Sequence, residues 1–199
     1  GKSKIIVPYD DRYTGAKSDW RSKKSLSGGG ILLDQGIHLL DLLRFFKGNF
    51  IEYKSFISNK FWNHDVEDNA FALMRDKKGV IASIHSTATQ WQHKFRIEIT
   101  AKYALIELQG ILSGSKSYGD ETMTTIYKGA GEGDAPTEQT VSYSVDHSWK
   151  DEIDEFTNAI VNDEPILYGT AQDALKTMEL VYKIYCADAD WKERFKISC

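Results

Sequence analysis

Cysteine is scarce in this sequence. Only two cysteines occur among the 199 residues, Cys186 and Cys199. Two cysteines are too few for the disulfide framework of a small secreted protein, and they do not have the spacing of a metal-binding motif. We therefore expect a reducing compartment, and the sequence predicts a cytoplasmic protein.

The sequence also lacks a dominant charge and a long apolar run. It has 29 acidic and 25 basic residues, a net charge of −4, and no extended run of either sign. This balance argues against a nucleic-acid surface or a polybasic membrane anchor, and favours small molecules or other proteins as partners. The longest apolar stretch, residues 37–46, contains His38, Asp41 and Arg44, so no transmembrane span or signal peptide is expected.

Length and composition favour one domain. With 199 residues and 41% hydrophobic content, the chain can form a single well-buried core, and we expect residues 1–199 to be one domain. Because the sequence starts at Gly1 and runs directly into an apolar segment, it is expected to be a fragment of a longer protein.

The most informative stretch is residues 27–48, SGGGILLDQGIHLLDLLRFFKG, which combines three glycines with an apolar helical pattern. At 100° per residue, Asp34, His38 and Asp41 fall on one narrow stripe of the predicted helix. The rest of its surface is almost entirely apolar, which predicts a buried helix. Buried charges need partners, so the three polar side chains are expected to contact each other, a neighbouring element, a metal or a ligand.

Two features at the start of this helix allow alternative interpretations. The glycines at 28–30 could leave backbone amides open to an incoming anion, or could allow close backbone packing, which local sequence favours. Arg21, just before the glycines, could hold an anionic substrate or form a surface salt bridge. Neither its motif nor its spacing decides between the two.

Alternating patterns predict strands at residues 50–61, 70–75, 80–90, 95–100, 104–108, 123–128 and 139–145. Two packing helices are expected after Ser148 and Thr170, each with a capping-box pattern. Short connections make the sheet antiparallel, so the sequence predicts an α+β two-layer sandwich: a mostly antiparallel, open-faced sheet of six or seven strands with helices on one face. An uncovered sheet face predicts a subunit or domain interface there. The glycines at 129–138 lack the G-x-G-x-x-G spacing, so no dinucleotide site is predicted.

His38 with Asp34 one turn earlier suits acid/base chemistry, because a carboxylate can orient the imidazole and stabilise its protonated form. A histidine packed in the core is the alternative. A metal site is not expected, because ligands spread over two helical turns span more than ~10 Å. His85 is interpreted as a packed sheet histidine that could face His38. The other histidines, at positions 64, 93 and 147, are expected to be solvated, and the acidic group at 65–68 to form a turn.

The run WRSKKSLSGGGILLDQGIHLLDLLRFFKG resembles the signature of the C-terminal domain of the Gfo/Idh/MocA oxidoreductases, W-R followed by G-G-G-x-x-x-D-x-G-x-H-x-x-D-x-x-x-x-x-x-G. The later segments FWNHDVEDNAFALM, TQWQHKF, SYGDE and DHSWKDEIDEF also suit that family. Members near sugar-nucleotide and polysaccharide biosynthesis are the most similar. The hairpin at 100–103 lacks the family's usual glycines, which affects turn geometry more than chemistry.

This resemblance implies a dehydrogenase acting on a sugar, sugar-nucleotide or polyol, in the oxidising or reducing direction. It implies that NAD or NADP binds mainly to an N-terminal Rossmann domain outside this chain, since neither the glycine fingerprint nor the family's E-K-P lysine segment is present. His38 matches the general base and Asp34 its orienting carboxylate. Arg21, Asp41 and Trp91 are the expected substrate contacts, and Asp41 is also expected to be structural.

The resemblance further implies a homo-oligomer, formed through the open sheet face. The competing interpretation is a binding or assembly module that keeps the fold without catalysing a reaction.

Overall fold

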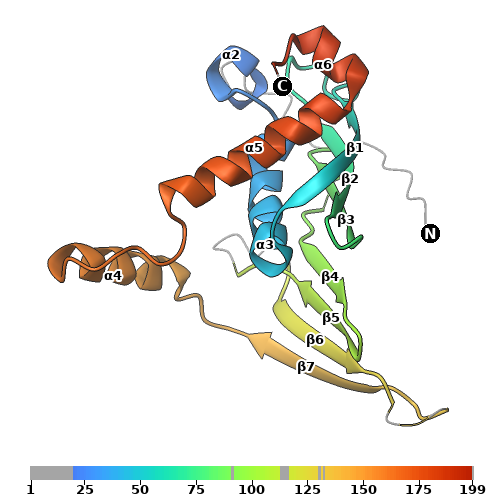
Figure 1. Ribbon diagram of the computed structural model, residues 1–199, viewed down its shortest axis with the longest axis vertical. Helices are drawn as coiled ribbons and strands as arrows, with labels where there is room; N and C mark the ends of the chain where they lie inside the picture. The colour runs from blue at the N-terminus through green and yellow to red at the C-terminus, as the bar shows by residue number, and fades with distance from the viewer. Residues whose placement is uncertain (1–19, 91, 113–116, 130, 132, 199) are drawn as a thin grey trace. The chain divides into compact units, whose positions relative to one another are not determined.

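The computed structural model describes residues 20–90, 92–112, 117–129, 131 and 133–198. The chain divides into two compact units (Figure 1). Unit 1 combines Gly1–Trp91 with Leu167–Cys199, and unit 2 is the intervening Gln92–Ile166. Within the described residues, seven antiparallel strands form two open sheets, which confirms the α+β class. A single continuous sheet was expected; instead, residues 88–90 and 92–95 form no strand, and hydrogen bonds join β1–β3 and β4–β7 separately.

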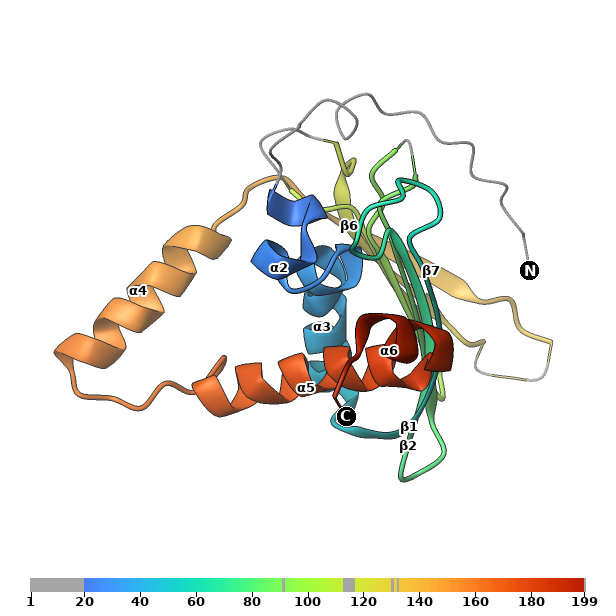
Figure 2. The ribbon, with the colours of Figure 1, turned by 90° about the horizontal axis from the view of Figure 1, so that it is seen from above.

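Unit 1 contains a three-stranded sheet made of β1 (Phe50–Ser58), β2 (Asn69–Asp76) and β3 (Ile81–Thr87) in sequential order. Alternate residues of β2 are buried, as the period of a strand requires when one face packs on a core. Helices α3 (Ile37–Lys47) and α5 (Ala171–Ala187) lie on one face of this sheet (Figure 2). The short helix α6 (Ala189–Phe195) follows α5.

One hydrophobic core joins these helices to the sheet. Its buried members are Leu32, Leu40, Phe50, Ala70, Ala72, Met74, Ile84, Leu180, Val181, Ile184, Tyr185 and Trp191. The expected packing role of the second C-terminal helix is thereby confirmed. Its start is confirmed too, since the side chain of Thr170 accepts a hydrogen bond from the backbone N–H of Asp173.

The glycine-rich segment is more broken than a single helix. It contains a 3₁₀ turn, η1 (Trp20–Ser22), a short helix, α2 (Lys24–Ser27), and a π turn, η2 (Leu32–Gly36), which leads into α3. Gly28 ends α2 in the left-handed region at φ 81°, which glycine adopts without steric cost. Helix α3 ends at Lys47 before Gly48, as the sequence predicts.

The expectation that this helix is buried on all sides is only partly met. Leu32 and Leu40 are fully buried, but Phe45 and Phe46 are exposed. His38 and Asp41 are exposed as well, so the prediction of a buried polar stripe is wrong for the chain taken alone. The apolar side chains of α3 exceed what one sheet face and one neighbouring helix can cover.

Unit 2 contains a four-stranded meander of β4 (Arg96–Thr100), β5 (Ala104–Gln109), β6 (Glu121–Tyr127) and β7 (Thr137–Tyr143). Helix α4 (Ser148–Val161) follows it. The packing role predicted for α4 is not seen, because all four side chains of its apolar stripe are exposed: Trp149, Ile153, Phe156 and Ile160. An amphipathic pattern predicts the helix and its apolar face, but not what covers that face.

No helix within the described residues is both long enough and apolar enough to cross a membrane.

Candidate functional site

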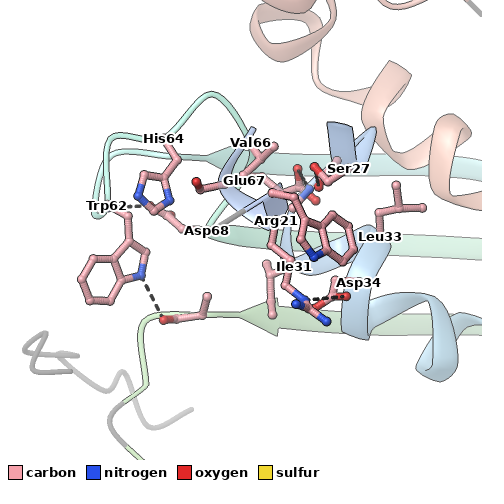
Figure 3. Close-up of a pocket in the computed structure, with 15 residues that line it drawn as sticks. Arg21, Ser27, Ile31, Leu33, Asp34, Trp62, His64, Val66, Glu67 and Asp68 are labelled. Carbon is pink, nitrogen blue, oxygen red and sulfur yellow. Dashed lines mark hydrogen bonds and ion pairs between the residues drawn. The ribbon is translucent and has the colours of Figure 1, made fainter. Parts of the chain in front are cut away.

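A cavity of about 290 Å³ lies in unit 1, beside the start of the glycine-rich segment. Its walls come from η1, from the glycines, from η2 and from the loop between β1 and β2 (Figure 3). The lining residues are Trp20, Arg21, Ser22, Ser27, Gly29, Gly30, Ile31, Leu33, Asp34, Trp62, His64, Val66, Glu67, Asp68 and Ala88. Figure 3 shows Trp62 and His64 at one end and Arg21 with Asp34 at the other.

An ion pair marks one end of the cavity. The Nε of Arg21 lies 3.6 Å from Oδ1 of Asp34, and the two side chains are 53% and 37% exposed. Gln35 donates a 3.2 Å hydrogen bond to the other carboxylate oxygen of Asp34, and the Arg21 guanidinium lies over the Trp20 ring. A pair this exposed contributes little to stability, so polar groups of a ligand can compete for both side chains. Arg21 thus forms a salt bridge and also lines the cavity.

Asp34 and His38 do not form the predicted hydrogen-bonded pair in the part of the chain described. No hydrogen bond joins their side chains, and His38 does not line the cavity. The Asp34 carboxylate contacts Arg21 and Gln35 instead. A shared stripe of a helix allows residues four apart to meet but does not require it.

Asp41 belongs to a network between α3 and α5. Thr177 donates a 2.7 Å hydrogen bond to Asp41, and Arg44 lies 3.7 Å from the same oxygen. Arg44 also pairs with the carboxylate of Asp173 at 2.7 Å. The Arg44 side chain is only 8% exposed, so this network fixes one end of α3 against α5. These contacts agree with a structural role for Asp41.

Glu67 is the most strongly held acidic residue at the cavity, and its role was missed in the sequence. One carboxylate oxygen accepts the Gly30 N–H at 2.8 Å, and the other accepts the Leu32 N–H at 3.0 Å. The Tyr185 hydroxyl donates to the second oxygen at 2.6 Å. The backbone carbonyl of Glu67 accepts the Ile31 N–H at 3.0 Å. The amides at the helix start are therefore occupied by Glu67, and the interpretation that they stay open to an anion is wrong.

Close packing explains the glycines instead. A Cβ atom at Gly30 would lie 2.0 Å from the carbonyl oxygen of Glu67, and one at Gly29 would lie 2.5 Å from the Tyr185 hydroxyl. Neither position tolerates a side chain without displacement of its neighbour. The prediction that the glycines allow close backbone approach is confirmed.

Burial changes the acidity of this cluster. Desolvation raises the pKa of Glu67, while its hydrogen bonds with Tyr185, Gly30 and Leu32 oppose that shift. Burial raises the pKa of Tyr185 well above its usual value, and the nearby Glu67 carboxylate raises it further. Tyr185 therefore remains a protonated hydrogen-bond donor at neutral pH.

The opposite end of the cavity is held by Asp68. Its Oδ2 accepts the backbone N–H groups of Phe61 and Trp62, both at 2.9 Å. The indole N–H of Trp62 donates to the carbonyl of Ala88 at 3.1 Å. These bonds hold a turn at residues 60–62 and fix Trp62 at the cavity wall. The acidic group at 65–68 was expected to form only a turn, but Glu67 and Asp68 line the cavity. His64 in the same loop is half-buried and lines the cavity, so the prediction of a solvated side chain is wrong. The sequence did not predict this position for His64, because the loop reaches the glycines through the pairing of β1 with β2.

The remaining histidines lie elsewhere. His85 stacks on Phe71, with ring centroids 3.7 Å apart, and burial lowers its pKa. The next residue, Ser86, donates to the Ile31 carbonyl, so the alternation of β3 directs His85 to the opposite face of the sheet, away from η2. The idea that His85 faces His38 is wrong. His93 is half-buried beside Ser117, contrary to expectation, and His147 is exposed as predicted.

Trp91 lies outside the described residues. Within the residues described, no cluster of three or more His, Cys, Asp or Glu side chains could hold a metal ion.

The described residues lack the parallel sheet of a Rossmann dinucleotide-binding fold. Every pair of neighbouring strands is antiparallel. A Rossmann site instead needs parallel strands and free amides at a glycine-rich helix start, and here those amides are bonded to Glu67. These residues therefore do not form a Rossmann-type site.

Residues 4–107, more than half of the sequence, match the profile of the GFO/IDH/MocA C-terminal domain. The chain belongs to this family. A comparison with curated protein sequences found no significant match.

Solved structures share the fold of this GFO/IDH/MocA domain at low sequence identity. Levoglucosan dehydrogenase in complex with NADH and levoglucosan has a TM-score of 0.70 at 17% identity, covering 86% of this chain and 52% of its own. The aldose-aldose oxidoreductase of Caulobacter crescentus has a TM-score of 0.69 at 20% identity, covering 88% and 50%. UDP-N-acetylglucosamine 3-dehydrogenase GnnA of Acidithiobacillus ferrooxidans has a TM-score of 0.69 at 18% identity, covering 93% of this chain and 53% of its own. The chain spans about half the length of these structures.

Proposed function

We propose that this chain is the substrate-binding domain of a cytoplasmic NAD(P)-dependent oxidoreductase that acts on a hydroxyl or keto group of a sugar, sugar nucleotide or polyol. One observation carries the proposal: every residue that lines the cavity falls within residues 4–107, the segment that matches the GFO/IDH/MocA C-terminal domain. The names of the similar structures, a levoglucosan dehydrogenase and a UDP-N-acetylglucosamine 3-dehydrogenase among them, support the substrate class.

The cavity suits a polyhydroxylated ring. Trp20 and Trp62 supply apolar ring surfaces, while Arg21, Asp34 and His64 supply hydrogen-bonding groups. Such a mixture of aromatic walls and few polar groups is typical of small-molecule sites. In this proposal Arg21 and Asp34 exchange part of their mutual pairing for substrate hydroxyls, and Trp91 is a further substrate contact.

His38 is the proposed general base. His38 lies outside the cavity but is exposed on α3, so in this proposal its imidazole accepts the hydroxyl proton from a part of the substrate that extends beyond the cavity. Asp34 then orients the substrate, or turns to the imidazole once substrate is bound. The nicotinamide of NAD or NADP supplies hydride exchange when bound, and in this proposal a separate Rossmann domain outside these residues holds it.

The test of His38 uses the full-length gene product. His38→Ala should lower kcat by roughly 100-fold or more, because general-base catalysis contributes that much. The control is His147→Ala, since His147 is exposed in unit 2 and should leave kcat unchanged. Near-normal turnover of His38→Ala would show that His38 is not the base.

A separate experiment tests the proposal that the cofactor binds to another domain. Isothermal calorimetry on the 199-residue chain should detect no binding of NAD(P). Micromolar affinity for either dinucleotide would contradict a separate cofactor domain.

A non-catalytic binding module is the second candidate. It is favoured by the absence, within the described residues, of a hydrogen bond between Asp34 and His38. The coding sequence upstream of Gly1 discriminates between the two: the dehydrogenase needs about 120 residues with a strand, G-x-G-x-x-G and a helix.

We further propose that the chain forms homo-oligomers through the outer face of the β1–β3 sheet. Phe56 pairs with Phe71, and Phe71 with His85, in the antiparallel register, so the three form one row across the sheet. Phe56 is 80% exposed, and Leu73 and Ile81 on the same face are also exposed. A continuous apolar face of this kind typically marks a protein interface.

A further inference from the structure

A helix start with free amides usually binds an anion from a ligand. In unit 1 the protein supplies that anion itself, because Glu67 occupies the amides of Gly30 and Leu32. Its side chain is fully enclosed, with 2% of the residue exposed. The carboxylate therefore acts as a permanent internal ligand of this backbone segment.

We propose that Glu67 is a positioning residue, whose carboxylate fixes the π turn that carries Asp34 and thereby sets the geometry of the Arg21–Asp34 end of the cavity. The catalytic consequence rests on the proposed function, in which Asp34 contacts the substrate.

A short chain of bonds connects Glu67 to Asp34. The Glu67 carboxylate binds the N–H of Gly30 at 2.8 Å, and the carbonyl of Gly30 accepts the N–H of Asp34, also at 2.8 Å. Asp34 in turn pairs with Arg21. A single residue, Gly30, thus lies between the buried carboxylate and the backbone of Asp34. A displacement of Gly30 would move Asp34 directly.

The contact has little freedom to shift. Glu67 binds three successive amides, those of Gly30 and Leu32 through its carboxylate and that of Ile31 through its carbonyl. The missing Cβ of Gly30 is what permits this approach. Tyr185 donates from α5 to the same carboxylate, which fixes the π turn against α5 as well.

The chemistry of the site requires a carboxylate rather than an amide. All three groups that face the side chain of Glu67 are donors: two backbone N–H groups and one hydroxyl. An ionised carboxylate accepts from all of them, whereas a glutamine would turn its NH₂ toward one donor. Glu67→Gln conserves the side-chain volume and removes only the match between the three donors and a group that accepts from all of them.

The first test measures amide hydrogen exchange by NMR on the 199-residue chain. In Glu67→Gln, exchange at Gly30, Leu32 and Asp34 should accelerate by about 10- to 100-fold, because a buried donor is left unsatisfied. Exchange in β2 should stay unchanged. Tyr185→Phe should have a smaller effect, since both backbone bonds remain. The control is Glu52→Gln, an exposed carboxylate on β1. Unchanged exchange at Gly30 and Leu32 in folded Glu67→Gln overturns the proposal.

The second test is chemical rescue. Glu67→Ala removes the carboxylate but leaves its three donors facing a void, which a small carboxylate such as formate can fill. Formate should slow exchange at Gly30 and Leu32 in Glu67→Ala by about tenfold or more, whereas chloride at equal ionic strength should not. Wild type should not respond to formate. Equal effects of formate and chloride overturn the proposal.

The catalytic consequence is measured in the full-length enzyme. Glu67→Gln should raise KM for the sugar substrate by about tenfold, and formate should restore activity to Glu67→Ala. A purely structural role would lower the amount of folded enzyme and leave KM unchanged, and that result overturns the positioning role. If the wild-type enzyme has no dehydrogenase activity, the proposed function is wrong. Amide hydrogen exchange and its response to formate then still decide whether Glu67 fixes the π turn.

Discussion

The hydroxyl of Tyr185 donates a 2.6 Å hydrogen bond to Oε1 of Glu67, although 118 residues separate them in the sequence. This bond joins α5 to the start of the glycine-rich segment. A second connection, from Arg44 to Asp173, joins α5 to α3 across 129 residues. Polar contacts centred on the buried side chains of Glu67 and Arg44 therefore hold both α3 and the glycine-rich segment to α5.

Replacing Arg44 with methionine should destabilise unit 1 by about 2 kcal/mol. The substitution leaves Asp173 and Asp41 without their cation, and the half-exposed carboxylates reduce the cost below that of a fully buried pair. The control is Arg75→Met, which breaks an exposed pair with Glu52 and should change stability by at most about 1 kcal/mol. Urea unfolding measures both, and equal losses would contradict the role assigned to Arg44.

Gly30→Ala should prevent folding or destabilise unit 1 by about 3 kcal/mol or more, since its Cβ would overlap the Glu67 backbone at 2.0 Å. Gly79→Ala is the control, because no atom lies near its Cβ and only its left-handed φ of 83° is unfavourable for alanine. That change should cost about 1 kcal/mol. Denaturant midpoints distinguish the two, and a Gly30 variant as stable as the Gly79 variant would show that the close contact is not required.

Asp76 should make stability depend on pH in the acid range. Its hydrogen bond with Lys47, and those with the amides of Val80 and Lys78, hold the pKa of Asp76 below its usual value. The unfolded chain then binds a proton more readily, so the stabilising contribution is complete above the unfolded pKa and is lost as pH falls through the folded pKa. Unfolding measured from neutral to acid pH should show this loss in wild type and a flatter profile in Asp76→Asn. Lys47→Met should raise the Asp76 pKa in an NMR titration. An unchanged pKa would contradict the assigned cause.

If the chain forms the proposed homo-oligomer through the β1–β3 sheet, Phe71→Glu should convert it to a monomer. Phe71 lies in the middle strand of the β1–β3 sheet, stacked on His85, so a charge there would be desolvated in any interface formed by this face. Trp149→Glu is the matched control on α4, where Trp149 is 76% exposed. Sedimentation should show dissociation for Phe71→Glu alone. Dissociation of the Trp149 variant instead would assign the interface to α4.

Local features of the sequence predict the secondary structure well. All seven expected strands are present, because alternation and turn residues are local signals. The end of α3 at Gly48 and the cap at Thr170 follow from neighbouring residues alone. Close packing at the glycines was also predicted, although the atoms that require it, on Glu67 and Tyr185, could not be identified.

Contacts between distant residues account for what the sequence did not predict. Glu67 looked like part of an acidic turn, since nothing near it shows that its partners are Gly30 and Tyr185. A helical wheel placed Asp34 and His38 on one stripe, but it could not show that Asp34 pairs with Arg21 instead. The apolar stripe of α4 was predicted correctly, but a stripe does not identify its partner.

Unit 1 is built from two stretches of sequence, with the whole of unit 2 between them. During synthesis, residues 50–87 leave the ribosome long before residues 171–187. Until α5 emerges, the inner face of the β1–β3 sheet lacks Leu180, Val181 and Ile184, and Glu67 lacks the Tyr185 donor. Contacts between residues so far apart in the sequence form slowly. Until they form, the exposed sheet face is prone to aggregation. Translation speed and chaperone supply are therefore expected to govern the yield of folded protein.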